Sequence, residues 1–137
     1  MPGAPERFAG PERPSKPAEA RRAVERAVTT GYREGGPRCD AAALSDAVLV
    51  ASELTTNAIL HGGGVTDFRV ELVGPELRLS VSDRSDDLPV PVAPADRQGR
   101  WSVGGRGWPI VCRLARDVRV AGLPSGGKCI SVLVPLS

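Results

Sequence analysis

Apolar residues recur along the chain with two different periods, which divide it into helical and extended segments. The helical period runs over residues 17–30 and predicts a helix that Ser15 caps and that ends near Gly31. It returns over residues 41–61, where Asp40 is a good N-cap and a triplet of glycines follows the last apolar position. We therefore expect two helices in the first half of the chain.

The extended period appears in two pairs of segments. Residues 66–73 and 76–82 alternate apolar and polar positions on either side of a Gly-Pro turn, which is typical of a two-stranded hairpin with one buried face. On the first of these strands, the positions expected to face the core are Phe68, Val70 and Leu72. Residues 118–121 and 129–134 predict two further strands joined by a glycine-rich turn.

A long loop and a third helix separate the two pairs of strands. Residues 83–104 show little periodicity, and a loop of that length is usually functional or disordered. In the helix that follows, Pro109 is acceptable only within the first turn. Its inward positions are expected to be Ile110, Val111, Leu114 and Ala115. This order of elements predicts an α+β fold, a two-layer α/β sandwich with helices on one face of a mixed, largely antiparallel sheet.

Composition limits the chain to one soluble domain. Its 137 residues leave room for one modest core over residues 15–137, preceded by a flexible Pro/Gly-rich arm over residues 1–14. The net charge is +2 without a long basic run, so direct binding to nucleic acid is not expected. The three cysteines form no C-x-x-C pair, which fits a reducing cytoplasm. Because no apolar run approaches about 18 residues and no signal peptide is evident, we expect a cytoplasmic protein without a membrane partner.

Candidate chemistry begins on the second predicted helix. Glu53, Asn57 and His61 are spaced four residues apart, which places a carboxylate, an amide and an imidazole along one edge of the helix. An asparagine oxygen suits Mg²⁺, which keeps several waters and shares its ligands with phosphates. Glu53 can accept a proton from an attacking hydroxyl or water. Taken one at a time, these residues are also ordinary at the rim of a helix.

Two other segments complete a possible nucleotide site. Asp83 ends the second predicted strand, where a buried carboxylate can accept a hydrogen bond from an exocyclic amine such as that of adenine; a strand-ending turn is its ordinary alternative. Gly105, Arg106 and Gly107 open the third helix, whose first N–H groups suit a phosphate. A simple glycine-rich turn would have the same residues. No P-loop or Rossmann motif is present.

The segments ELTTNAILHG, VSDRSDDLP, GGRGWPIVCRLA and GGKCISVLVP, in this order, resemble the ATP-binding domain of anti-sigma factor serine/threonine kinases in the GHKL superfamily. The resemblance implies a Bergerat-type, histidine-kinase-like fold that holds Mg-ATP beneath a lid formed by residues 84–103. It implies that Asn57 is the magnesium ligand, Glu53 the catalytic base and Asp83 the adenine-binding residue. It also implies that Gly105 and Gly107 lie on the phosphate side and that His61 lines the same cleft. Arg106, between the two glycines, is a further candidate cofactor-binding residue.

The chain departs from that family's pattern in two places. The family commonly has Asp-x-Gly-x-Gly on the adenine side, whereas Asp83 is followed here by Arg84, Ser85 and Asp86 without either glycine. Lys128 stands where related sequences often have threonine. It is a candidate phosphate ligand, although an exposed lysine at the end of a strand is the more ordinary expectation.

These observations favour an ATP-binding regulatory protein that controls a sigma factor. It is expected to phosphorylate a serine or threonine of a small antagonist protein, using ATP and Mg²⁺ as cofactors, and the resemblance suggests a homodimer. The alternative is a partner-switching module without catalysis, with or without bound nucleotide. A sensor histidine kinase is disfavoured because the only histidine, His61, lies inside the motif itself.

Overall fold

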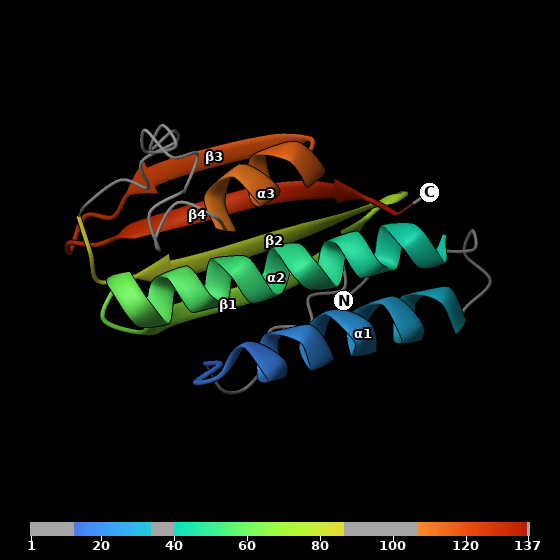
Figure 1. The fold of residues 1–137 in the computed structure, drawn as a ribbon, viewed down its shortest axis with the longest axis horizontal. Helices are drawn as coiled ribbons and strands as arrows, with labels where there is room; N and C mark the ends of the chain where they lie inside the picture. Colours follow the sequence, from blue (N-terminus) through green and yellow to red (C-terminus); the bar gives the residue numbers. More distant parts are fainter. Residues whose placement is uncertain (1–12, 34–39, 87–106, 137) are drawn as a thin grey trace, which may run out of the picture.

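The computed structural model describes residues 13–33, 40–86 and 107–136, and these form three helices and four strands (Figure 1). In chain order the elements are α1 (Pro17–Arg33), α2 (Ala41–His61), β1 (Val65–Val73), β2 (Glu76–Asp83), α3 (Gly107–Leu114), β3 (Asp117–Gly122) and β4 (Lys128–Pro135). Every predicted helix and strand is present in the expected order. Of the arm expected over residues 1–14, only Arg13 and Pro14 are described, and Pro14 is buried.

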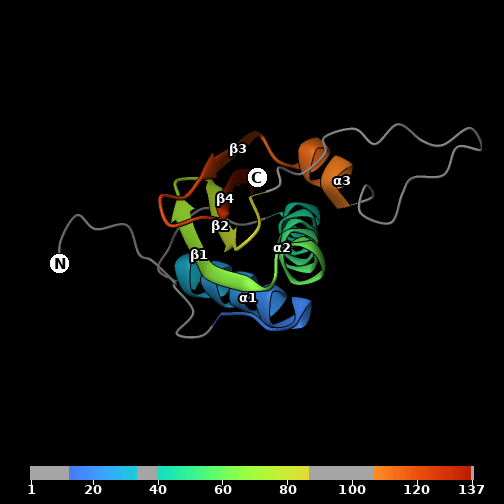
Figure 2. The same cartoon turned by 90° about the vertical axis from the view of Figure 1, so that its left-hand side faces the viewer.

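The four strands form one sheet in the order β1-β2-β4-β3, and each described neighbour pair is antiparallel. All three helices cover the same face of this sheet (Figure 2). The α+β two-layer sandwich is therefore confirmed, although no parallel pair occurs among the described strands. The register places Asp83, the last residue of β2, directly opposite Lys128, the first residue of β4.

The core lies between the sheet and α2. This helix buries small and branched residues, namely Ala47, Val50, Ala51, Leu54, Thr55 and Ala58. The inner face of the sheet presents Val70, Leu79 and Val132 to them, all almost fully buried. By length and composition alone α2 is also apolar enough to cross a membrane, contrary to the expectation that the apolar runs fall short, but in the fold it contacts α1, α3 and the sheet.

The ends of α1 differ from the sequence prediction. Ser15 does not accept a hydrogen bond as a cap; instead its N–H and hydroxyl both donate to the Glu19 carboxylate at 2.8 Å, and the Lys16 N–H donates at 3.2 Å. The helix also continues past Gly31, where an added Cβ would collide with the side chain of Leu72 on β1. Gly31 therefore permits close packing of helix on strand rather than ending the helix.

The buried face of α3 is centred on Trp108 and Val111, which are 6% and 1% exposed. Pro109 lies in the first turn, as predicted, and Leu114 packs at the edge of the core. Ile110 is only half-buried and does not join the core, so its inward assignment is wrong. Trp108 and Val111 are three residues apart and share one face of α3, whereas Ile110 is turned about 100° away from Val111 around the helix.

Candidate nucleotide site

The edge of α2 predicted from the four-residue spacing is present along an unbroken helix. Glu53 and Asn57 are half-buried, and His61 is exposed at the last helical residue. A rise of about 1.5 Å per residue places Glu53 and His61 about 12 Å apart along the helix axis. The edge is therefore continuous, and its three side chains are partly or fully exposed.

The glycine triplet turns the chain sharply at the end of α2. The N–H groups of Gly62 and Gly64 both donate to the carbonyl of Ala58, at 3.0 and 2.9 Å. Gly63 and Gly64 have φ angles of 76° and 106°, in the region that favours glycine. The turn directs the chain into β1 and ends the helix at His61, so the candidate edge ends there as well.

Asp83 lies against the same end of α2. The N–H of Arg84 donates to the carbonyl of Gly62 at 2.9 Å, which joins the end of β2 to the end of the helix (Figure 1). Asp83 is 4% exposed, and a Cβ added to Gly62 would lie 2.5 Å from its Cγ. The fold thus brings Asp83 beside the end of α2 at which the candidate edge finishes.

The side chain of Lys128 forms an ion pair with the carboxylate of Asp83. Lys128 Nζ lies 3.0 Å from both Oδ1 and Oδ2 of the carboxylate, and the two side chains are 8% and 5% exposed. The expectation of an exposed strand-end lysine is wrong, because the inner-face register of β4 turns Lys128 toward Asp83. The sequence could have suggested the pair only through the register, since the two residues are 45 positions apart.

Hydrogen bonds fix the position of the residues that follow Asp83. The N–H of Ser85 donates to Asp83 Oδ1 at 2.9 Å. Asp86 Oδ1 accepts a hydrogen bond from the N–H of Gly127 at 2.8 Å, so this carboxylate is directed at the turn between β3 and β4. A Cβ on Gly127, whose φ is 89°, would meet the carbonyl oxygen of Asp83. The two strand ends are therefore packed closely around the Asp83–Lys128 pair.

The third part of the predicted site is described only at its last residue. Gly107 begins α3, which packs against α2, whereas Gly105, Arg106 and residues 87–103 of the predicted lid lie outside the described residues. The next residue, Trp108, was missed as a buried anchor. Its indole Nε1 is buried without a hydrogen-bond partner in the part of the chain that the structure describes. It is a buried polar atom next to the predicted phosphate-binding helix end.

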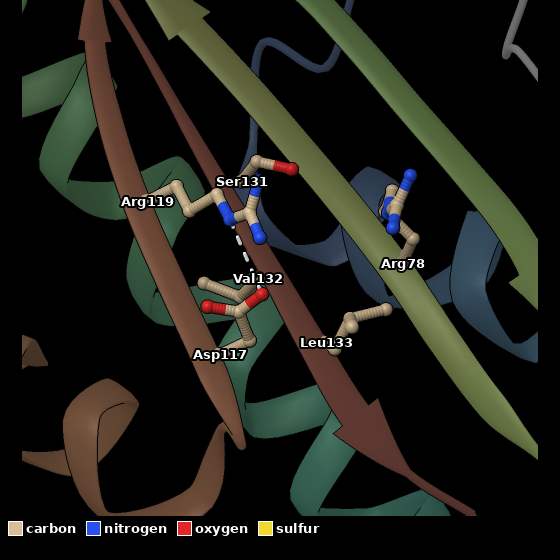
Figure 3. Close-up of a pocket in the computed structure, with 6 residues that line it drawn as sticks. All are labelled: Arg78, Asp117, Arg119, Ser131, Val132 and Leu133. Carbon is tan, nitrogen blue, oxygen red and sulfur yellow. Dashed lines mark hydrogen bonds and ion pairs between the residues drawn. The ribbon is translucent and has the colours of Figure 1, made fainter.

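A separate shallow pocket lies on the face of the sheet opposite the helices (Figure 3). It measures about 110 Å³ and is lined by Arg78, Asp117, Arg119, Ser131, Val132 and Leu133. Asp117 and Arg119, two residues apart on β3, form an exposed ion pair beside it at 3.2 Å. None of the predicted site residues lines it, so it is not the candidate nucleotide site.

Comparison with known proteins assigns the chain to a class. The family model of the histidine kinase-like ATPase domain matches residues 11–133, and the chain belongs to this family. It is an ATP-binding type of domain in the GHKL group.

One similar solved structure is the histidine kinase domain from the Erythrobacter litoralis EL346 blue-light activated histidine kinase. The two share 21% sequence identity with a TM-score of 0.49, over 88% of this chain and 60% of that one. The chain thus spans about 60% of the length of that structure's chain. No curated protein sequence matches the chain.

The α2 side of the site fits Mg-ATP, whereas the Asp83 side fits only in part. Among the described residues no group of three His, Cys, Asp or Glu side chains is placed to hold a metal. Mg²⁺ uses few protein ligands beside water and phosphate oxygens, and the half-buried Asn57 has an amide oxygen of the kind it binds. Asp83 has the chemistry to accept an amine, but Lys128 already holds both of its oxygens.

Proposed function

We propose that the protein is an ATP-binding regulator of the anti-sigma type that phosphorylates a serine or threonine of a small antagonist protein and thereby controls a sigma factor. The proposal places it in the cytoplasm, as a homodimer. The observation that supports it most is the open edge of α2, where Glu53 and Asn57 lie one turn apart on a helix that ends against Asp83.

Each residue of the edge has a separate role in this proposal. Asn57 supplies a neutral oxygen ligand for Mg²⁺, and Glu53 orients the attacking hydroxyl and accepts its proton. When bound, Mg-ATP supplies the phosphoryl group that is transferred. The N–H groups at the start of α3 bind phosphate, since they carry the partial positive charge of a helix N-terminus. Catalysis of this kind depends mainly on positioning and on stabilisation of charge.

The test separates catalysis from binding. Wild-type protein should transfer labelled phosphate from ATP to a serine or threonine of a candidate antagonist, in an acid-stable form. Glu53→Ala should abolish the transfer, while a titration shows that Mg-ATP binding survives. Ser45 is exposed on α2 about two helical turns before Glu53. Ser45→Ala is therefore the matched control and should retain transfer. Transfer by Glu53→Ala at the wild-type rate would rule out Glu53 as the base.

A second candidate is a module that sequesters a partner without phosphorylating it. The buried Asp83–Lys128 pair favours it, because the carboxylate of Asp83, which was expected to bind adenine, already has Lys128 as its partner. The absence of both glycines after Asp83 points the same way. Calorimetry decides between the two: no heat and no thermal shift with millimolar Mg-ATP would favour the module, and saturable binding followed by transfer would favour the kinase.

A further inference from the structure

We propose that Lys128 competes with the nucleotide base for Asp83 and thereby sets the affinity of this chain for adenine nucleotides. The proposal rests on the proposed function, in which Asp83 receives the exocyclic amine of adenine. Lys128 takes that position first, since its Nζ lies 3.0 Å from each carboxylate oxygen. Base binding therefore requires the exchange of one partner of Asp83 for another.

The acceptor capacity of Asp83 explains the competition. An ionised carboxylate offers about four acceptor positions. Lys128 takes one on each oxygen, and the N–H of Ser85 takes another on Oδ1 at 2.9 Å. Among the contacts of the described residues, this leaves one acceptor position on Oδ2 without a donor. An amine that approached it would place its positive N–H edge beside the ammonium group, where the two donors repel each other.

The backbone of two glycines packs closely against Asp83. A Cβ on Gly62 would lie 2.5 Å from the Cγ of Asp83, so the end of α2 covers one side of the carboxyl group. Gly127 packs against the main-chain carbonyl of Asp83. Because these contacts at Gly62 and Gly127 hold the side chain and the main chain of Asp83 in place, the group that moves is the long side chain of Lys128.

The exchange has a cost that the base must offset. Lys128 and Asp83 are 6% and 4% exposed, and a buried charge that loses its partner is strongly unfavourable. A hydrogen bond to a charged group contributes a factor of roughly 10 to 150 in binding. As long as Lys128 keeps its ion pair with Asp83, the binding of adenine lacks this gain in affinity. Replacing Lys128 with threonine should restore that gain in affinity.

The first experiment compares the affinity for nucleotide and nucleoside with and without the Lys128 side chain. Calorimetry gives the Kd of Mg-ATP, and of adenosine, for wild type and Lys128→Thr. Adenosine has no phosphate, so its Kd is free of the effect of removing a positive charge. We expect both ligands to bind Lys128→Thr at least about tenfold more tightly than wild type. Lys16→Thr, which removes the exposed second lysine of the chain, should match wild type.

A second experiment uses wild-type protein and does not depend on how the variant folds. The chain has two lysines, Lys16 and Lys128, so selective ¹⁵N labelling of lysine yields two ammonium signals, assigned with Lys16→Thr. The signal of the buried Lys128 should be present in the free protein and should shift or disappear with saturating adenosine. An unchanged Lys128 signal at saturation would overturn the proposal.

The outcomes separate this inference from the proposed function. Equal or weaker binding of adenosine by a folded Lys128→Thr protein overturns the inference and leaves the kinase proposal in place. Tighter binding without phosphate transfer to any antagonist supports the inference and overturns the kinase. If neither wild type nor Lys128→Thr binds Mg-ATP or adenosine while both are folded, both proposals fail.

Discussion

The backbone of Gly62 lies directly against the carboxylate of Asp83, so that a Cβ at residue 62 would lie 2.5 Å from Asp83 Cγ and 2.6 Å from Oδ2. Gly62 has φ −108° and ψ 3°, a conformation open to most residues. The glycine is therefore required by the close approach of α2 to β2 and not by backbone conformation. This contact fixes where the candidate edge of α2 meets Asp83.

Gly62→Ala should destabilise the fold by about 1–3 kcal/mol, the usual cost of overpacking. The added methyl group must displace Asp83 or shift the end of α2. Urea denaturation measures the change in the free energy of unfolding. Gly122→Ala is the control, because a Cβ there meets nothing within 4 Å, and it should change stability by no more than about 0.5 kcal/mol. Equal stability of the two variants would show that the packing at Gly62 is loose.

The buried pair of Asp83 and Lys128 should be strongly coupled in the apo protein. Asp83→Asn or Lys128→Met alone leaves one buried charge without its partner and should cost about 3–5 kcal/mol. The double variant should be more stable than either single variant, because no buried charge remains. Denaturation of the four proteins gives the coupling energy. Simple addition of the two single effects would mean that the ion pair does not form in solution.

Glu19 should make the start of α1 sensitive to acid. The hydroxyl and N–H of Ser15, followed by the Lys16 N–H, hold the pKa of Glu19 below its ordinary value of 4.5. Since the folded pKa is the lower one, the stabilisation is complete above pH 4.5 and is lost as the pH falls through the folded pKa.

An NMR titration of the Glu19 carboxyl carbon measures this pKa directly. Ser15→Ala removes the hydroxyl donor that contributes most and should move the midpoint back toward 4.5. A wild-type midpoint at or above 4.5 would contradict the contacts of Ser15 with Glu19.

The elements could be predicted from the sequence because their signals are local. The alternation of the strands, Asp40 as the N-cap of α2 and the glycines after His61 each act within a few residues. The prediction was wrong at Gly31 because a glycine inside a helix and one at its end look alike in sequence. What distinguishes them is Leu72, on another element 41 positions away, which packs where a Cβ would be.

For the candidate site, the sequence predicts which side chains share an edge of α2 but not the contacts around Asp83. The spacing of Glu53 and Asn57 is sufficient to place them on one edge, since a helix has a fixed period. Lys128 could not be placed, because its partner depends on the register of β2 with β4. A lysine at a strand end is usually exposed. Lys128 is buried because the register of β2 with β4 places it on the inner face of the sheet, opposite Asp83.

The central claim, that this chain binds Mg-ATP on the edge of α2, is tested most directly by calorimetric titration of Mg-ATP into wild type, Asn57→Ala and the control Ser45→Ala. We predict saturable binding to wild type and Ser45→Ala with the same Kd. Asn57→Ala should bind at least about tenfold more weakly, a difference of about 1.4 kcal/mol. The same Kd for Asn57→Ala as for wild type, or no binding by any of the three folded proteins, would contradict the claim.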